Sequence, residues 1–162
     1  MAEPTALAFK QAMRGLVGAC SLITVGEGDL ATGLVVTSGV SLTAEPPMVL
    51  ACVHRATSSW PLFERFRRFG WSALGAADQG VAERFSGASG VQGHARYEGA
   101  RWTVAENGVQ TLAEAPLALV CDLEEMIDRG THSIVIGRVR SIRTNPGRGA
   151  LVYWNGVYRG LE

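Results

Sequence analysis

The distribution of short apolar segments constrains the fold of this chain more than any other feature. These segments are rich in β-branched residues and are separated by turn residues, so they predict β-strands. Expected strands span residues 19–25, 31–43, 48–53, 69–74, 117–126, 132–142 and 150–154, with a kink near Gly39 and a weak strand near Trp102. Helices are expected only over 6–17, 58–69 and 78–85, where apolar side chains recur at helical spacing.

The order of these elements argues against a parallel α/β fold. Strands and helices do not alternate regularly, which disfavours a doubly wound parallel sheet. No GxGxxG motif opens a helix after a strand, so the usual dinucleotide-binding fold is not indicated. We expect a mainly β fold with accessory helices, built as a small closed or nearly closed antiparallel barrel. The chain of 162 residues amounts to one domain, 1–162, and the glycine-rich segment 86–99 is expected to be a loop.

Charge and composition disfavour several classes of function. Fifteen basic and fifteen acidic residues give a net charge of zero, whereas nucleic-acid binding and polybasic membrane attachment call for a basic excess. No apolar run approaches the roughly 20 residues that span a bilayer, and residues 1–10 lack the features of a signal peptide. We therefore expect a soluble cytoplasmic protein. A net charge of zero is unfavourable for a free monomer, which gives mild support to a dimer.

No metal site or covalent catalytic motif is recognisable. Cys20, Cys52 and Cys121 lie far apart in apolar segments and form no CxxC pair, so we expect reduced, buried thiols. The sequence has no HExxH, no P-loop, no GxSxG and no cysteines at zinc spacing. We therefore expect no metal.

Two hydroxyl-rich segments are candidate ligand sites. Thr37 and Ser38 begin a polar stretch near the predicted kink, where hydroxyls and backbone amides could bind the polar edge of a planar ligand. A solvent-facing strand would show the same pattern. Residues 55–59 precede a predicted helix and could bind an anion or simply cap that helix. Spacing alone favours the structural explanation in both segments.

Two further side chains stand out for their position. Arg84 lies at the end of a predicted helix beside the glycine-rich loop, where it could pair with a phosphate or interact with the helix dipole. His132 follows a glycine turn into an apolar strand. Its ring could point into a cleft, or it could be a hydrogen-bonded structural histidine.

The order of several segments carries a family resemblance. The segments are Phe9–Met13, Ser21–Thr24, Gly33–Pro47, Val49–His54, Ser58–Ser59, Ala82–Phe85, Gly130–Val139 and Leu151–Tyr158. Together they span nearly the whole chain and resemble the flavin reductase-like family of split-barrel NAD(P)H:flavin oxidoreductases. The resemblance implies an FMN-binding split barrel with Greek-key topology, and a homodimer with flavin near the subunit interface. It also implies FMN or FAD, NADH or NADPH as hydride donor, and a separate monooxygenase that receives reduced flavin.

The same resemblance implies the site residues. Around the isoalloxazine and ribityl chain it places Ala31, Thr32, Gly33, Leu34, Val35, Thr37 and Ser38, and from the next strand Cys52, Val53 and His54. At the phosphate end it places Ser58, Ser59, Arg84 and Phe85. On the nicotinamide side it places Val152, Tyr153, Trp154 and Asn155, with His132 as the catalytic candidate that positions the nicotinamide.

Three positions depart from the family pattern, and other functions stay open. Thr131 stands where many members have aspartate, His54 where asparagine is common, and Trp71-Ser72 where relatives often have Val-Asn. The implied reaction is hydride transfer from the nicotinamide to flavin N5. The alternatives are reduction of another acceptor, such as a corrinoid, at a retained flavin, a flavin-binding electron carrier without a nicotinamide site, and a dimeric scaffold with a degenerate site.

Overall fold

The computed structural model describes residues 3–162 and is mostly β. The helices are α1 (Ala6–Met13), α2 (Trp60–Phe66) and α3 (Gln79–Phe85), with 3-10 turns η1 (Gly28–Leu30) and η2 (Gly93–Tyr97). The first six strands are β1 (Gly18–Ala19), β2 (Ser21–Val25), β3 (Thr32–Val36), β4 (Val40–Ala44), β5 (Pro47–His54) and β6 (Arg68–Ala73). The last six are β7 (Trp102–Val104), β8 (Gln110–Leu112), β9 (Leu117–Arg129), β10 (His132–Thr144), β11 (Ala150–Trp154) and β12 (Val157–Leu161).

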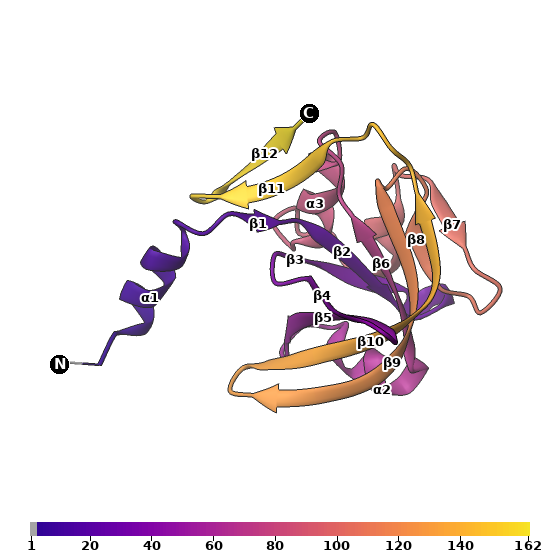
Figure 1. Cartoon of the computed structure of the whole chain (residues 1–162), viewed down its shortest axis with the longest axis horizontal. Coiled ribbons are helices and arrows are strands. Elements are labelled where there is room, and N and C mark those ends of the chain that lie inside the picture. Colours follow the sequence, from indigo (N-terminus) through magenta and orange to yellow (C-terminus); the bar gives the residue numbers. More distant parts are fainter. Residues whose placement is uncertain (1–2) are drawn as a thin grey trace.

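Seven strands form one antiparallel sheet in the order β3-β2-β6-β9-β10-β5-β4 (Figure 1). The sheet curls until β3 lies near β5, yet its two end strands, β3 and β4, are not paired with each other. The barrel is therefore open along this line, as in a split barrel. A three-stranded sheet, β1-β11-β12, and the hairpin β7-β8 lie beside it.

Two buried clusters hold the sheet in this shape. One fills the barrel and includes Phe63, Phe69 and Trp71. The other lies between the outer face of the sheet, α3 and η2, and includes Phe85 and Tyr97. Strand β2 contributes to both clusters, so all five of its residues are buried. A strand covered on both faces reads as a continuous apolar run, which is how the sequence predicted it.

The helices are shorter than the sequence predicts. Helix α2 ends at Phe66 because Arg67 adopts a left-handed conformation, with φ of 56°, and β6 begins at the next residue. Helix α1 begins as expected, with the Thr5 hydroxyl accepting from the N–H of Ala8 at 3.2 Å. It ends at Met13, four residues early, and none of its residues is buried.

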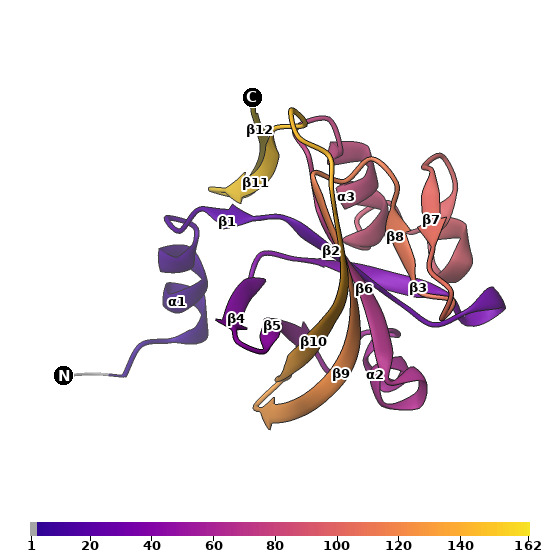
Figure 2. The same ribbon diagram turned by 45° about the vertical axis from the view of Figure 1, so that its right-hand side comes forward.

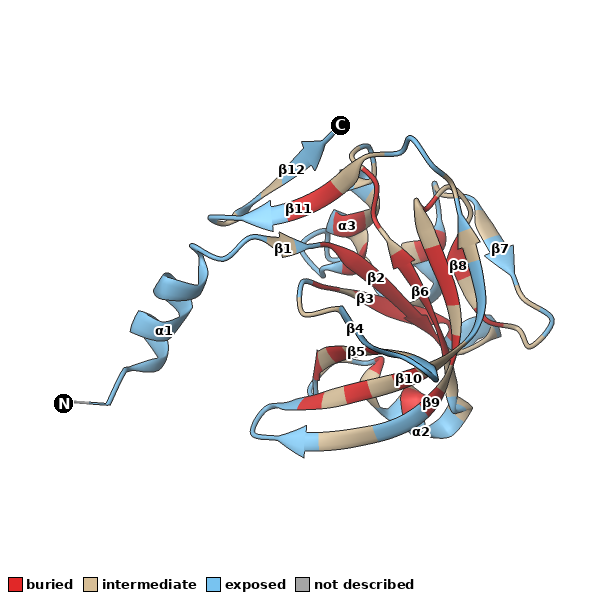
Figure 3. Ribbon diagram, viewed as in Figure 1, coloured by how far each residue is buried: buried red, intermediate tan, exposed pale blue. Residues whose placement is uncertain are grey.

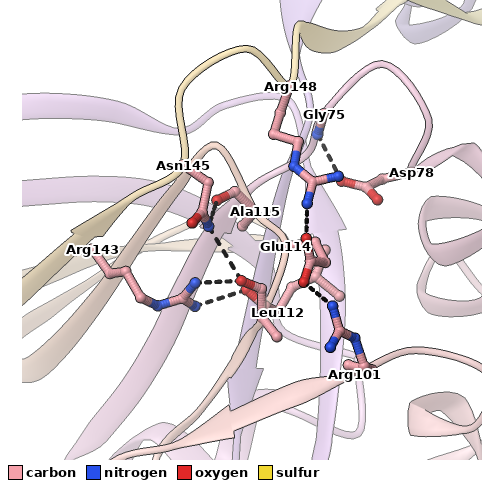
Figure 4. A network of polar contacts seen from close by, with 10 residues as sticks. Gly75, Asp78, Arg101, Leu112, Glu114, Ala115, Arg143, Asn145 and Arg148 are labelled. Atoms are coloured by element: carbon pink, nitrogen blue, oxygen red, sulfur yellow. Dashed lines mark hydrogen bonds and ion pairs between the residues drawn. The ribbon is translucent and has the colours of Figure 1, made fainter.

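A polar network holds the segment that leads into β11 (Figure 4). Asn145 donates through Nδ2 to the carbonyls of Ala113 and Ala115, at 3.2 and 2.7 Å. Arg143 donates to the carbonyl of Leu112 at 2.9 Å. Glu114 forms ion pairs with both Arg101 and Arg148. These contacts tie the end of β10 and residues 145–149 to the β7–β8 hairpin and thereby set the direction of β11.

Helix α1 stands apart from the barrel, as both views of the ribbon show (Figures 1 and 2). The residue after it, Arg14, accepts at its carbonyl from the N–H of Asn155 at 3.1 Å, which fixes the chain against the β11–β12 turn. Colouring by burial shows α1, β4 and most of β12 as exposed (Figure 3). Within residues 3–162, no helix is long and apolar enough to cross a membrane.

Candidate functional site

A cleft of about 1030 Å³ lies where the barrel is split. Strand β3 forms one wall and the end of β5 the other, while η2 and the loop before α2 close its two ends. The lining residues are 29–38, Cys52, His54, 56–58, Leu62, Phe85, Ser86, Gln92, Gly93, Arg96 and His132. This volume is at the upper end of the range, about 300–1,000 Å³, that small-molecule sites occupy.

Ser38 bridges the two walls at the point where strand pairing is absent. Its hydroxyl accepts from the N–H of Cys52 at 3.0 Å and lies 3.3 Å from the Cys52 carbonyl, to which it donates. Strand β3 itself is an end strand of the sheet, so its outer edge carries N–H and C=O groups without a strand partner. The wall therefore offers alternating donors and acceptors beside apolar side chains.

Turn η2 packs against β3 through two polar contacts. Arg96 donates to the carbonyl of Gly33 at 2.7 Å and to that of Val91 at 2.9 Å. The Tyr97 hydroxyl donates to the carbonyl of Thr32 at 2.8 Å. Burial raises the pKa of Tyr97, so this hydroxyl keeps its proton at neutral pH and remains a donor.

The loop before α2 is held by its own side chains. Nδ1 of His54 accepts from the N–H of Ala56 at 3.0 Å, and the Thr57 hydroxyl donates to the His54 carbonyl at 2.8 Å. Ser59 occupies the N-cap position, but its buried hydroxyl donates to Thr57 Oγ1 at 3.1 Å and does not cap the helix. The capping explanation for this segment is therefore wrong for Ser59. The Ser58 side chain is left exposed in the cleft.

Two histidines lie side by side at the cleft. His132 and His54 are direct partners in the β10–β5 register, and their ring centroids are 4.8 Å apart with an interplanar angle of 72°. His132 Nδ1 is 2.8 Å from the Thr131 hydroxyl. The ring of His132 is exposed and lines the cleft while its Nδ1 is hydrogen-bonded, so both interpretations of this residue from the sequence stay open.

The structure brings most of the predicted site residues to this cleft. These are Ala31, Thr32, Gly33, Leu34, Val35, Thr37, Ser38, Cys52, His54, Ser58, Phe85 and His132. Val53, Ser59, Arg84 and residues 152–155 do not line it. Val53 faces the barrel core, because alternate residues of β5 point to opposite faces.

Arg84 lies behind η2 and not in the cleft. Its guanidinium donates to the carbonyl of Ala95 at 2.7 Å and to that of Arg96 at 3.3 Å, and it lies 3.8 Å from Glu98. The sequence offered a phosphate ligand or a dipole-stabilised cation for this residue. The structure places Arg84 in the last turn of α3, where the helix dipole favours a cation, and its guanidinium holds η2, whose own Arg96 lines the cleft.

Of residues 152–155, only Tyr153 lines a second cavity, which has a volume of about 690 Å³. Tyr153 lines it together with Tyr158, and their rings meet edge to face at 5.0 Å. This cavity adjoins the cleft, because Val35 and Thr37 line both. Val152 is buried, and Trp154 lies at the end of β11 under the guanidinium of Arg159.

The cleft also includes residues that the sequence did not single out. Arg96 and Gln92 come from a segment read as a loop, and Asp29 and Leu62 from a turn and a helix face. An arginine and a tyrosine side by side in a glycine-rich segment were the available signal for η2.

The thiols differ from the expectation at one position. All three cysteines are free. Burial raises the pKa of Cys20 to about 11. Burial, together with the charge of Asp122, raises the pKa of Cys121 to about 12. Both are therefore inert thiols at neutral pH. Cys52 is only half-buried and lines the cleft, so the expectation of burial is wrong there. Residues 3–162 contain no cluster of three or more histidine, cysteine, aspartate or glutamate side chains placed to hold a metal.

Comparison with known proteins decides the family. The family model described as "Flavin reductase like domain" matches residues 13–162. The chain belongs to the flavin reductase-like family. A relative from Pseudomonas syringae pv. syringae, named FMN reductase (NADH) RutF, is 34% identical over 161 residues, which cover 99% of this chain and 89% of the relative. The predicted family and its oxidoreductase class are confirmed.

Solved structures agree with this placement. A protein from Haemophilus somnus has a TM-score of 0.91 and 27% identity, covering 98% of this chain and 100% of that one. BorF, the flavin reductase component of a bacterial two-component tryptophan halogenase, has a TM-score of 0.88 and 26% identity, covering 97% and 98%. The expected mainly β split barrel is confirmed.

Proposed function

We propose that this chain is an NADH-dependent flavin reductase that binds FMN, or the flavin part of FAD, in the cleft at the split of the barrel and transfers a hydride to it. The observation that carries the proposal is the cleft itself. It lies between β3 and β5 in a chain that is 34% identical to a relative named FMN reductase (NADH). We propose that residues 1–162 form one catalytic domain.

The residues of the cleft fit a flavin. Leu34, Val35, Leu62 and Phe85 give the cleft an apolar lining suited to a fused aromatic ring system, and Val35 and Leu62 are the more exposed of the four. Beyond the Thr32 and Gly33 carbonyls that η2 engages, the outer edge of β3 offers backbone groups for the polar edge of the pyrimidine ring. The exposed hydroxyl of Ser58 lies at the end of the cleft near α2, where a phosphate would be accommodated.

The protein contributes position and electrostatics to this reaction. The bound flavin supplies the hydride-accepting ring, so no residue of the chain is needed as an obligatory general base. The walls of the cleft would hold the two reactants face to face, which raises the rate by orienting them. Backbone N–H groups along β3 and at residues 37–38 would hold the polar edge of the flavin and favour negative charge there. His132 contacts the nicotinamide of the hydride donor.

Arg84 supports flavin binding only through η2. Arg84→Ala is therefore expected to weaken the binding of FMN and of riboflavin by a similar factor, about 3- to 10-fold, because it loosens η2, a wall of the cleft that both ligands contact. Titration of intrinsic flavin fluorescence with each ligand measures the two dissociation constants. Ser58→Ala is the matched comparison. It is expected to weaken the binding of FMN more than that of riboflavin, because only FMN carries the phosphate proposed to lie at Ser58. A loss confined to FMN in Arg84→Ala would show that this arginine holds the phosphate.

We further propose that reduced flavin leaves the cleft for a separate oxygenase component. Support comes from BorF, the reductase component of a two-component halogenase, and from a nitrilotriacetate monooxygenase component B homologue that is 25% identical with a TM-score of 0.86. The cleft is open to solvent along the split and allows a flavin to enter and leave. Transfer is tested by adding the partner oxygenase and following its product.

A second copy of the chain is the proposed partner for α1. Leu7, Phe9, Met13, Leu16 and Val17 are between 44% and 67% exposed. An eight-residue helix with no buried side chain is not stable alone in water, and contiguous exposed apolar surface marks an interface. Apolar side chains on β4 and the β11–β12 hairpin are also exposed: Val40, Leu42, Trp154, Val157 and Leu161.

Charges placed on α1 and on the turn that follows it are expected to abolish the dimer. Leu7→Glu combined with Leu16→Glu places two carboxylates in the apolar surface, and we expect a monomer at micromolar concentration where the wild type is a dimer. Size-exclusion chromatography with light scattering measures the mass. Val104→Glu is the control, because Val104 is 61% exposed on β7, on the side of the barrel away from α1 (Figure 1). A wild-type monomer would rule out this partner.

Steady-state assays test the proposed reaction. NADH oxidation is expected to require added FMN or FAD, to saturate with both substrates and to proceed without any metal. Flavin-dependent oxidation that occurs only when a corrinoid is supplied would favour the alternative acceptor.

A further inference from the structure

The ring of His132 is packed against another ring, that of His54. The two residues face each other across the β5–β10 pair, and their rings meet edge to face, an arrangement that aromatic rings favour. Both line the cleft. Each ring therefore restricts the rotation of the other.

Each ring is also held at its Nδ1 atom. The N–H of Ala56 donates to Nδ1 of His54, which places the hydrogen of the neutral ring on Nε2. Nδ1 of His132 lies 2.8 Å from the hydroxyl of Thr131. With both Nδ1 atoms engaged, the Nε2 edges are the polar edges left for a ligand.

The charged neighbours of this pair are engaged elsewhere. Arg55 lies 3.4 Å from Asp128, and its guanidinium stacks over the ring of Trp60. Asp128 also accepts from the Ser133 hydroxyl at 2.6 Å. Arg129, the partner of His132 in the β9–β10 register, donates to the carbonyl of Asp128 at 2.7 Å. None of these three charges is hydrogen-bonded or ion-paired to the ring of His132, so its contacts are with His54 and Thr131.

We propose that His54 is a positioning residue: its ring, anchored through Ala56, holds His132 with Nε2 directed at the carboxamide of the hydride donor. A carboxamide carries both a donor and an acceptor, so a ring nitrogen in a fixed orientation binds it in either tautomer. The proposal rests on the proposed function for its ligand, but the pairing of the rings does not.

Two substitutions distinguish the effect of the His54–His132 ring contact from the effect of the hydrogen bond that His54 makes to the Ala56 N–H in the turn. His54→Asn removes the ring, while the asparagine oxygen can still accept from the N–H two residues on. His54→Phe keeps an edge-to-face ring but removes the acceptor. We expect His54→Asn to raise the KM for NADH about 2- to 10-fold, the effect of one aromatic contact, with kcat changed less. The KM of His54→Phe for NADH is expected to lie much closer to that of the wild type than to that of His54→Asn.

Imidazole NMR of the flavin-free protein provides a readout besides activity. The chain has three histidines, and His94, stacked on Tyr97 outside the cleft, is an internal control. His54→Asn is expected to shift the ring signals of His132 and leave those of His94 in place. His94→Gln is expected to leave the KM for NADH unchanged, because His94 contacts neither ring of the His54–His132 pair.

Several outcomes would overturn the proposal. These are unchanged His132 signals in His54→Asn, an unchanged KM in that variant, or a His54→Phe variant as impaired as His54→Asn, which would assign the effect to the turn. A wild type that does not oxidise NADH would refute the proposed function and the carboxamide ligand, while the NMR experiment would still decide whether His54 orients His132.

Discussion

Replacing His132 by alanine is expected to raise the KM for NADH about 10-fold, the cost of one lost hydrogen bond to the ligand. The dissociation constant for FMN is expected to change by no more than about 2-fold, because the residues proposed to bind flavin along β3 and at Ser38 are left unchanged. Steady-state kinetics with varied NADH measure the first quantity, and fluorescence titration measures the second.

His94→Ala is the matched control for this prediction, since His94 is exposed and does not line the cleft. A His132→Ala variant with wild-type kinetics would remove His132 from the reaction. A variant that loses FMN affinity and keeps its KM for NADH would place His132 on the flavin side of the cleft.

Phe63→Ala is expected to have the largest effect on stability. Phe63 is fully buried, is the only buried residue of α2, and meets the ring of Phe69 edge to face at 5.6 Å. Truncating a buried phenylalanine costs about 3–5 kcal/mol, and for a chain of this size that lowers Tm by about 10 °C. Because α2 follows the loop that carries Ser58, FMN affinity is also expected to fall several-fold. Chemical and thermal denaturation measure the first effect.

Phe66→Ala on the same helix is the control, since Phe66 is only half-buried and should lose less stability. Equal losses in the two variants would show that α2 is not held to the barrel by Phe63. FMN affinity has to be measured well below the Tm of each variant, so that unfolding does not contribute to the result.

The strands of the barrel could be predicted because the faces that a strand buries determine its pattern of apolar residues. Strand β2 is covered on both faces and reads as an apolar run, and β5 alternates between buried and more exposed residues. The strand β12 was missed, although Asn155 and Gly156 have φ of 50° and 84°, the backbone that a two-residue hairpin turn requires. That dipeptide between apolar segments was the available signal.

The cleft was predicted less completely, because its lining brings together residues from segments that lie far apart in the sequence. The residues of β3 and β5 follow from the strands that carry them and from the resemblance. Arg84 and Arg96 show what a linear pattern misses: both are cations near a glycine-rich segment, and only the path of η2 decides which one faces the cleft. The ring contact between His54 and His132 depends likewise on a strand register between residues far apart in sequence.

The most direct test of the central claim is an anaerobic stopped-flow experiment. The protein and FMN are mixed with NADH without oxygen, and the yellow absorbance of the flavin is followed. We predict rapid bleaching whose rate saturates with NADH, and slower bleaching in His132→Ala at low NADH concentration. Tight flavin binding with no bleaching by NADH or NADPH would contradict the reductase and leave a flavin-binding electron carrier in its place.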